Sequence, residues 1–305
     1  MSWINIKQGC YYYHATVNIG YVTNGSDTGI IIDTGLEPQA IKKVIKVIES
    51  ENLPITNCFI THAHADHFGG AAYLKNQKNV TIYAPPFEAA IMENPLLEPL
   101  YLYHGAKPPK ELRNKFVEGA PIKVDVLLSE GTFEIGGISI QCISLPGHSY
   151  EQMGFIINGI LFAADSYFGK ETLVKHKIPY IIDANQTIQT LKKILSLPIC
   201  GALPGHGTYE ENFLETIELN IKTHNNITND ILNLLNTNEE GLSLEAVMEC
   251  LCAKHEIHLS NLGQWALYRT AITAYINKLI QDDQAMWEVI NNRLIVKTKN
   301  SSTFE

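Results

Sequence analysis

The sequence predicts an α/β sandwich followed by a small, mainly helical domain. Three observations predict this fold class: short apolar, strand-like runs recur up to about residue 212, amphipathic helical patterns lie between them, and the pattern turns helical from Phe213 onward. Strands grouped with interspersed helices are typical of sheets covered by helices. With 305 residues, 45% of them hydrophobic, the chain is long enough for one large domain and a small second one. We therefore expect domains at 1–212 and 213–305.

The predicted strands are apolar runs that mostly end in Gly, Pro, Asp or His. They cover residues 18–22, 29–33, 58–61, 80–84, 133–145, 155–163 and 199–203. The clearest helical patterns place Ile41, Val44, Ile45 and Ile48 on one face and, later, Ile188, Leu191 and Leu195 on another.

Residues 85–123 differ from their surroundings because prolines interrupt the apolar positions. We expect an inserted, partly helical segment that forms a lid or wall of the substrate pocket. Its apolar contact area would come from Leu96, Leu97, Leu100, Tyr101 and Tyr103. The alternative is a structural cap packed on the sheet edge.

The tail, 213–305, shows three helical patterns and then a β-hairpin around Asn291-Asn292, an order that resembles a winged-helix module. Its third helix offers only Arg269 and Lys278 as basic residues, and acidic residues outnumber basic ones from Glu239 onward. We therefore expect a packing module that covers one side of the active-site cleft rather than a reader of nucleic acid.

The net charge of −9 makes nucleic acid an unfavourable partner, because binding to phosphates depends on clustered Lys and Arg. No signal peptide pattern is visible, and no apolar run approaches the ~20 residues that span a bilayer. We expect a cytoplasmic protein with no membrane partner and with its six scattered cysteines buried and reduced. The sequence leaves open whether the chain forms a homo-oligomer.

The strongest signal is the run Thr61-His62-Ala63-His64-Ala65-Asp66-His67, which places four candidate ligands directly after an apolar strand. A tight loop of small residues after a strand lets these side chains converge. Imidazole and carboxylate groups suit zinc and neighbouring divalent metals.

Three further elements have the same form, because His148, Asp165 and His206 each follow an apolar strand. In this order the four elements resemble the metallo-β-lactamase superfamily, and the resemblance covers about residues 18–207.

The resemblance implies an αββα sandwich with two divalent metal ions, zinc first and iron or manganese as alternatives. His62, His64 and His148 would hold one ion, Asp66, His67 and His206 the other, and Asp165 would bridge them. A hydroxide shared by two ions would be the nucleophile. Asp66 would also be catalytic, orienting the hydroxide and passing a proton to the leaving group.

Several further residues are candidates for supporting roles. In the resembling family, the residue that matches Asp33 hydrogen-bonds the ligand loop; the alternative here is a helix N-cap. Tyr150, Tyr167 and Tyr209 lie within a few residues of a ligand and are candidates for substrate binding. His104 and His176 match no motif but fall near the expected cleft.

The full ligand set looks like that of hydroxyacylglutathione hydrolases, lactonases and endoribonucleases of the superfamily. We expect a hydrolase of a small-molecule ester, thioester or lactone, and the alternative is a nucleic-acid-processing phosphodiesterase. Antibiotic hydrolysis is disfavoured, because the secreted enzymes with a cysteine ligand place it where this chain has Asp165.

Overall fold

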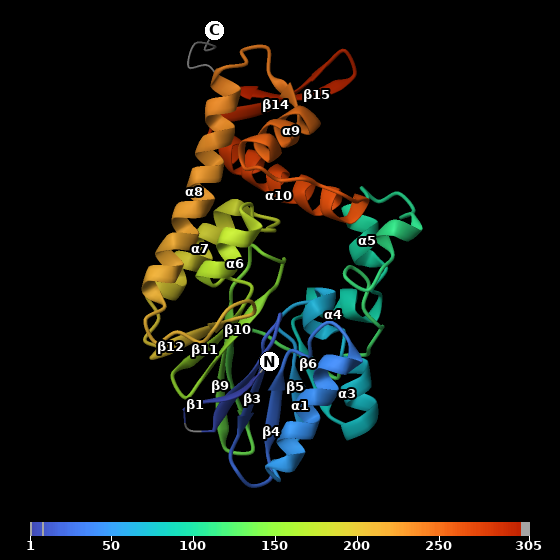
Figure 1. Ribbon diagram of the computed structural model, residues 1–305, viewed down its shortest axis with the longest axis vertical. Helices are drawn as coiled ribbons and strands as arrows, with labels where there is room; N and C mark the ends of the chain where they lie inside the picture. The colour runs from blue at the N-terminus through green and yellow to red at the C-terminus, as the bar shows by residue number, and fades with distance from the viewer. Residues whose placement is uncertain (1, 8, 300–305) are drawn as a thin grey trace.

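The computed structural model describes residues 2–7 and 9–299 and contains two β-sheets packed face to face, with helices on both outer faces (Figure 1). The αββα arrangement predicted from the sequence is therefore confirmed. The first sheet runs in the order β1-β2-β3-β4-β5-β6-β7. Its strands are β1 (Ser2–Lys7), β2 (Cys10–His14), β3 (Ile19–Thr23), β4 (Gly29–Ile32), β5 (Asn57–Phe59), β6 (Thr81–Ala84) and β7 (Val126–Leu127).

The second sheet runs in the order β12-β11-β10-β9-β8. Its strands are β8 (Gly131–Ile135), β9 (Ile138–Ser144), β10 (Met153–Ile157), β11 (Ile160–Ala164) and β12 (Gly201–Pro204). Pairing is parallel from β4 through β7 and between β11 and β12, and antiparallel elsewhere in the two sheets. The parallel pairs matter for the site, because their carboxyl ends meet at one edge.

Three buried clusters hold the layers together. The faces of the two sheets meet through residues such as Ile30, Phe59 and Phe155. Helices α1 (Pro38–Ser50) and α3 (Ala71–Lys78) cover the outer face of the first sheet, where the predicted stripe from Ile41 to Ile48 is buried. Helices α7 (Ala184–Leu195) and α8 (Leu214–Asn236) cover the second sheet.

Two predicted single strands are in fact hairpins. The run 133–145 breaks at Gly136-Gly137, and the run 155–163 breaks at Asn158-Gly159. All four turn residues have positive φ, from 53° to 77°, as a two-residue turn between twisted strands requires. A continuous apolar pattern hid the turn at Asn158-Gly159, whereas Gly136-Gly137 is a turn signal between alternating runs that the prediction passed over. The strands β1 and β2 were also not predicted.

The insertion contains α4 (Pro86–Glu93), α5 (Leu97–Leu102) and the short 3-10 helix η1 (Lys110–Leu112). It does not pack only on the sheet, since Leu102, Leu112 and Val117 form a buried cluster with Ala266 of the C-terminal region. The two segments therefore meet over one end of the sandwich (Figure 1).

The C-terminal region contains α8, α9 (Leu244–Lys254) and α10 (Leu262–Gln281) with a sheet of order β13-β15-β14. Its strands are β13 (Leu242–Ser243), β14 (Ala285–Ile290) and β15 (Arg293–Thr298). Asn291 and Asn292 both have positive φ, at the predicted hairpin turn. The buried core of this region includes Ile178 and Ile181, so it is continuous with the residues that precede it in the chain. Whether the region belongs to the winged-helix class stays a prediction.

Among the described residues, no helix is both long and apolar enough to cross a membrane. All six cysteines are free thiols, but the expectation that they are buried fails for Cys200 and Cys250, which are exposed.

A buried polar pair joins α8 to α10 in the C-terminal region. Tyr275 Oη lies 2.7 Å from His224 Nδ1, and burial lowers the pKa of His224 to about 4, so the imidazole is neutral and accepts the hydrogen bond. Tyr275→Phe leaves that nitrogen without a partner and should lower the free energy of unfolding by ~1–3 kcal/mol, measured by denaturant titration. Tyr73→Phe is the control, because no hydrogen bond of the Tyr73 hydroxyl is found in residues 2–7 and 9–299. Equal losses in both variants would contradict this account.

Candidate metal centre

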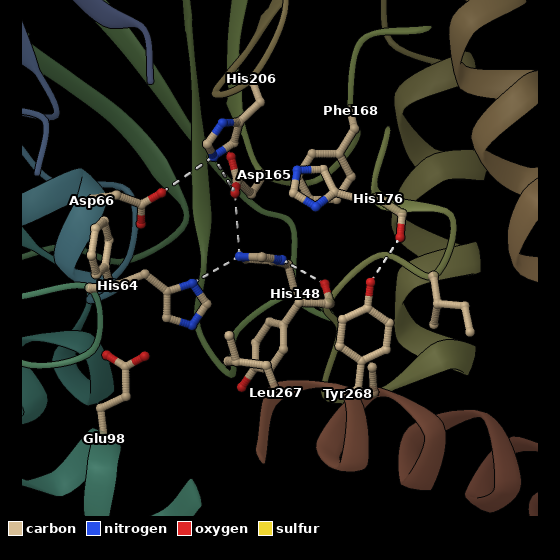
Figure 2. A pocket seen from close by; sticks show the side chains of 14 residues that line it. His64, Asp66, Glu98, His148, Asp165, Phe168, His176, His206, Leu267 and Tyr268 are labelled. Carbon is tan, nitrogen blue, oxygen red and sulfur yellow. Dashed lines mark hydrogen bonds and ion pairs between the residues drawn. The ribbon is translucent and has the colours of Figure 1, made fainter. Parts of the chain in front are cut away.

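The seven predicted ligands gather at one edge of the sandwich, where the strands that precede them end. His62 and His64 lie in the loop after β5, and Asp66 and His67 lie in the short helix α2 (Ala65–Phe68) that follows it. His148, Asp165 and His206 follow β9, β11 and β12. Figure 2 shows five of these side chains pointing toward one another: His64, Asp66, His148, Asp165 and His206.

Three imidazoles form the first cluster. His64 Nδ1 lies 3.0 Å from His62 Nε2 and 2.8 Å from His148 Nε2. Burial lowers the pKa of all three, that of His64 to about 3, so each ring presents a neutral nitrogen. Three neutral nitrogens at this spacing are a suitable ligand set for a divalent metal.

A second cluster joins Asp66, His67 and His206, whose ligand atoms lie within 4.8 Å of one another. His206 Nε2 is 3.4 Å from Asp66 Oδ2 and 3.3 Å from Asp165 Oδ2. Asp165 also lies 3.4 Å from His67 Nε2 and 3.5 Å from His148 Nε2. Its carboxylate therefore touches both clusters, as a bridging ligand must.

Two buried atoms in the centre fit a bound cation. His67 Nε2 and Asp165 Oδ1 are fully buried and have no hydrogen-bond partner within the described part of the chain. A buried polar atom without a partner costs about 1–3 kcal/mol, so such atoms need an explanation. The donor set of imidazoles and carboxylates supplies one, because it suits zinc, iron or manganese.

Asp33 holds the ligand loop in place. The backbone N–H of Thr61 donates to its Oδ1 at 2.9 Å, and His67 Nδ1 lies 2.7 Å from its Oδ2. Burial alone would lower the pKa of His67, but the carboxylates of Asp165 and Asp33 raise it well above its usual value. The alternative N-cap role is wrong, because α1 begins after Glu37 and Asp33 adopts φ 60°.

Backbone and hydroxyl groups orient the other imidazoles. Thr61 Oγ1 lies 3.0 Å from His62 Nδ1, the Tyr180 carbonyl 2.9 Å from His148 Nδ1, and the Thr16 carbonyl 2.8 Å from His206 Nδ1. Each contact fixes Nδ1, so Nε2 is left facing the centre.

Glu88, in α4 of the insertion, is a supporting residue that sequence reasoning missed. Its Oε2 accepts from Ala63 N at 2.8 Å, and its Oε1 accepts from Ser149 Oγ at 2.8 Å and from Glu151 N at 3.0 Å. One buried carboxylate therefore ties the His62–His64 loop to the loop after His148. No motif could reveal it, because it is a single acidic residue in an otherwise ordinary helix.

Asn18 and Gly205 shape the loop that carries His206, and they were also missed. The Asn18 amide donates to the carbonyls of Pro204 and Gly207, at 2.8 Å each. A Cβ on Gly205 would lie 2.1 Å from Asp165 Oδ1, so only glycine lets the loop approach the bridging carboxylate.

A cavity of about 250 Å³ opens onto the centre. Apart from the ligands, its walls are mostly apolar or aromatic, with one further carboxyl, Glu98. The residues that line it are His64, Asp66, Glu98, Phe116, His148, Asp165, Phe168, His176, Ile178, Tyr180, His206, Leu267, Tyr268 and Ala271. The insertion and α10 both contribute to the wall, as the sequence led us to expect.

The structure places the three predicted tyrosines outside this cavity. Tyr167 is 1% exposed and packs in the core beneath α7 and α8, Tyr150 contacts Phe87 at the surface, and Tyr209 packs against Gly201. Closeness to a ligand in sequence did not predict direction, because all three tyrosines lie in loops after the strands, where side-chain direction depends on the path of the loop.

Of the other predicted positions, some line the cavity and some do not. His176 lines the cavity, whereas His104 contacts Arg269 at 2.9 Å outside it. Of the insertion, Glu98 and Phe116 reach the wall, while Leu96, Leu97 and Tyr101 are exposed.

Comparison with known proteins agrees with the geometry. Residues 14–206 match the family model described as "Metallo-beta-lactamase superfamily". The chain is 26% identical over 154 residues to a hydroxyacylglutathione hydrolase of Rhodopseudomonas palustris, covering 50% of this chain and 48% of that protein. It is 24% identical over 202 residues to an atrochrysone carboxyl ACP thioesterase of Aspergillus fumigatus, covering 66% and 54%. The chain spans between 48% and 66% of the length of the first curated relatives that it matches.

A crystal structure of a beta-lactamase domain protein from Burkholderia ambifaria superimposes with a TM-score of 0.74 at 16% identity, covering 97% of this chain and 94% of that one. This match includes the C-terminal region, and at such identity it supports the fold alone.

The Glu88 contacts lead to a prediction about metal retention. In Glu88→Gln the side chain keeps one acceptor oxygen, and its NH2 group faces a backbone N–H, either of Ala63 or of Glu151. We expect metal affinity to fall by roughly 10–100-fold, as for loss of other groups that orient ligands. Dialysis against a graded chelator series, followed by metal analysis, measures the change. The matched control is Glu134→Gln, at an exposed position of β8. Retention equal to that of the unmodified protein would contradict the role of Glu88.

Proposed function

Because the chain belongs to the metallo-β-lactamase superfamily, which includes relatives named as hydrolase and thioesterase, we propose that it hydrolyses a small-molecule carboxylic ester, thioester or lactone. The observation that carries the proposal is the largely apolar cavity that the candidate ligands help to line. Its volume of about 250 Å³ suits an acyl group or a similarly compact part of a substrate.

The site would hold two divalent ions, one at each of the two clusters of candidate ligands. His62, His64 and His148 would hold one, and Asp66, His67 and His206 the other. Asp165, which contacts both clusters, would be shared. Bound ions supply a water that ionises near neutral pH and polarise the oxygen of the scissile group.

Asp66 is the carboxylate best placed to handle a proton. Its side chain is 33% exposed and lines the cavity, whereas that of Asp165 is 5% exposed. The contact with His206 fixes one oxygen of Asp66, so the other is left to face the substrate. Burial alone would raise the pKa of Asp66, but the neighbouring His67 and His206 lower it, so Asp66 would accept a proton only in passing and deliver it to the leaving group.

The walls favour an uncharged organic substrate over a nucleic acid. Across the described ranges 2–7 and 9–299, no lysine or arginine lines this cavity. A polynucleotide needs an extended electropositive track beyond the scissile bond. The two named relatives act on glutathione-linked or carrier-protein-linked acyl groups by their names, which makes a thioester the first substrate to test.

Metal stoichiometry tests the ligand assignment. The protein should bind two divalent ions per chain, and Asp66→Ala should lose one of them selectively. Asp165→Ala should weaken both, and turnover should fall by more than the 10–100-fold typical of orienting groups. Metal analysis and turnover measured on the same samples check both variants. One equivalent at saturation, or full occupancy in either variant, would defeat the assignment.

Substrate class is tested with matched substrates. The metal-loaded protein should hydrolyse nitrophenyl carboxylic esters, simple thioesters or lactones with a higher kcat/KM than bis-nitrophenyl phosphate or a short RNA. Removal of metal by a chelator should abolish the activity, and adding zinc, iron or manganese should restore it. RNA cleavage that falls steeply with salt, with negligible esterase or thioesterase activity, would instead establish a phosphodiesterase.

A further inference from the structure

Glu98 is a buried carboxyl that the metal centre does not use. It lies on α5 in the insertion, it is 4% exposed, and it lines the cavity. Figure 2 shows its carboxyl directed toward the cavity on the side of His64. It belongs to none of the clusters whose atoms are close enough to share a metal.

No group of the described chain satisfies this carboxyl. None of the side-chain hydrogen bonds or ion pairs in residues 2–7 and 9–299 includes Glu98, and its oxygens are not among the fully buried atoms without a partner, so they are open to the cavity that Glu98 lines. Its charged neighbours are the carboxylates Asp66 and Glu88, and together with burial they raise the pKa of Glu98 well above its usual value. A carboxyl kept in such surroundings costs free energy unless something binds to it.

We propose that Glu98 is a substrate-recognition residue that hydrogen-bonds an uncharged polar group, an amide or a hydroxyl, of the molecule that is hydrolysed. This inference rests on the proposed function. A neutral carboxyl offers one O–H donor and acceptor oxygens, which match such groups. Among the described residues no lysine or arginine lines the cavity to pair with a charged Glu98, and the nearby carboxylates Asp66 and Glu88 disfavour that form, so an ammonium group on the substrate is the less favoured partner.

The placement explains how the insertion selects substrates. Glu98 is held by α5, and the neighbouring Leu102 packs with Ala266 of α10, so the carboxyl is carried by a packed element and not by a free loop. Binding a substrate that lacks the polar group would leave Glu98 buried without a partner. Rejecting such a substrate therefore follows from the cost of an unsatisfied buried group.

The test compares thioesters that differ only in the polar group. The amide pair is S-butanoyl-N-acetylcysteamine and S-pentyl butanethioate, and the hydroxyl pair is S-pentyl 3-hydroxybutanethioate and S-pentyl butanethioate. Butanoylthiocholine tests a cation. The variants are Glu98→Leu and Glu98→Gln, with Glu111→Leu, at an exposed position of the same insertion, as the matched control.

In the metal-loaded unmodified protein, at least one polar member should exceed its apolar partner by about tenfold or more in kcat/KM, which corresponds to ~1.4 kcal/mol. Glu98→Leu should remove this preference, mainly through KM. Glu98→Gln should keep it, because an amide also donates and accepts. Glu111→Leu should change nothing.

Three results would overturn the proposal. The first is equal treatment of both members of each pair by every variant. The second is a preference for butanoylthiocholine that Glu98→Gln abolishes, which would assign a charged carboxylate. The third is a loss of bound metal in Glu98→Leu as large as the loss of activity, which would make Glu98 a support for the ligands.

A binding measurement separates this proposal from the proposed function. Calorimetry with the non-hydrolysable thioethers N-[2-(butylsulfanyl)ethyl]acetamide and butyl pentyl sulfide reports recognition without turnover. If no thioester is cleaved but the amide thioether binds more tightly in a Glu98-dependent way, recognition stands and hydrolysis of thioesters fails. If cleavage occurs and neither thioether nor thioester depends on Glu98, the function stands and the recognition role is overturned.

Discussion

The hydrogen bonds that Asp33 accepts are the interaction on which the rest of the site depends. This residue ends β4 with a left-handed backbone, φ 60°, so that its carboxylate turns back toward the loop after the neighbouring strand β5. There it receives Thr61 N–H and contacts His67 Nδ1. Because Asp33 fixes Nδ1 of the His67 ring, Nε2 faces Asp165. Asp33 follows a strand of the first sheet and Asp165 a strand of the second, so this one imidazole connects the two sheets. The sandwich thus brings polar atoms from both sheets together at a buried edge, in groups that could hold a metal ion.

Close approach at that edge imposes demands on residues that have no chemistry of their own. Gly205 must lack a side chain because Asp165 lies against it, and Gly147, with φ 126°, passes directly over Thr187 just before His148. Glu88 then links two ligand loops from outside both sheets. Because Glu88 lies in the insertion, that segment is part of the scaffold of the centre as well as a wall of the cavity. A deletion of the whole insertion would therefore disturb the ligands and could not isolate an effect on substrate binding.

The sequence predicted the parts of the molecule that depend on dense local signals. The four candidate ligands in the run from His62 to His67, and the turn Asn291-Asn292 between two apolar strands, could be found without knowledge of distant residues. The Asn158-Gly159 hairpin was hidden because the strands on both sides are fully apolar, being covered on both faces. Tyr167 was wrongly expected in the pocket since its direction depends on packing with α7 and α8. Glu88 and Glu98 were invisible for the same reason: a single carboxyl in a helix acquires meaning only from what the fold brings against it.

The candidate ligands and the rest of the cavity wall come from different segments of the chain. The loops at the strand ends and the short helix α2 supply the seven candidate ligands, while Glu98, Phe116, Leu267, Tyr268 and Ala271 come from the insertion and α10. These two segments contact each other through Leu102, Leu112 and Ala266, so a change in either alters the shape of the same wall. Substitutions in this wall leave the ligand atoms and their orienting contacts in place. A metal centre typical of the superfamily can therefore serve a substrate that its ligands do not specify, and the identity of that substrate has to be sought in the wall.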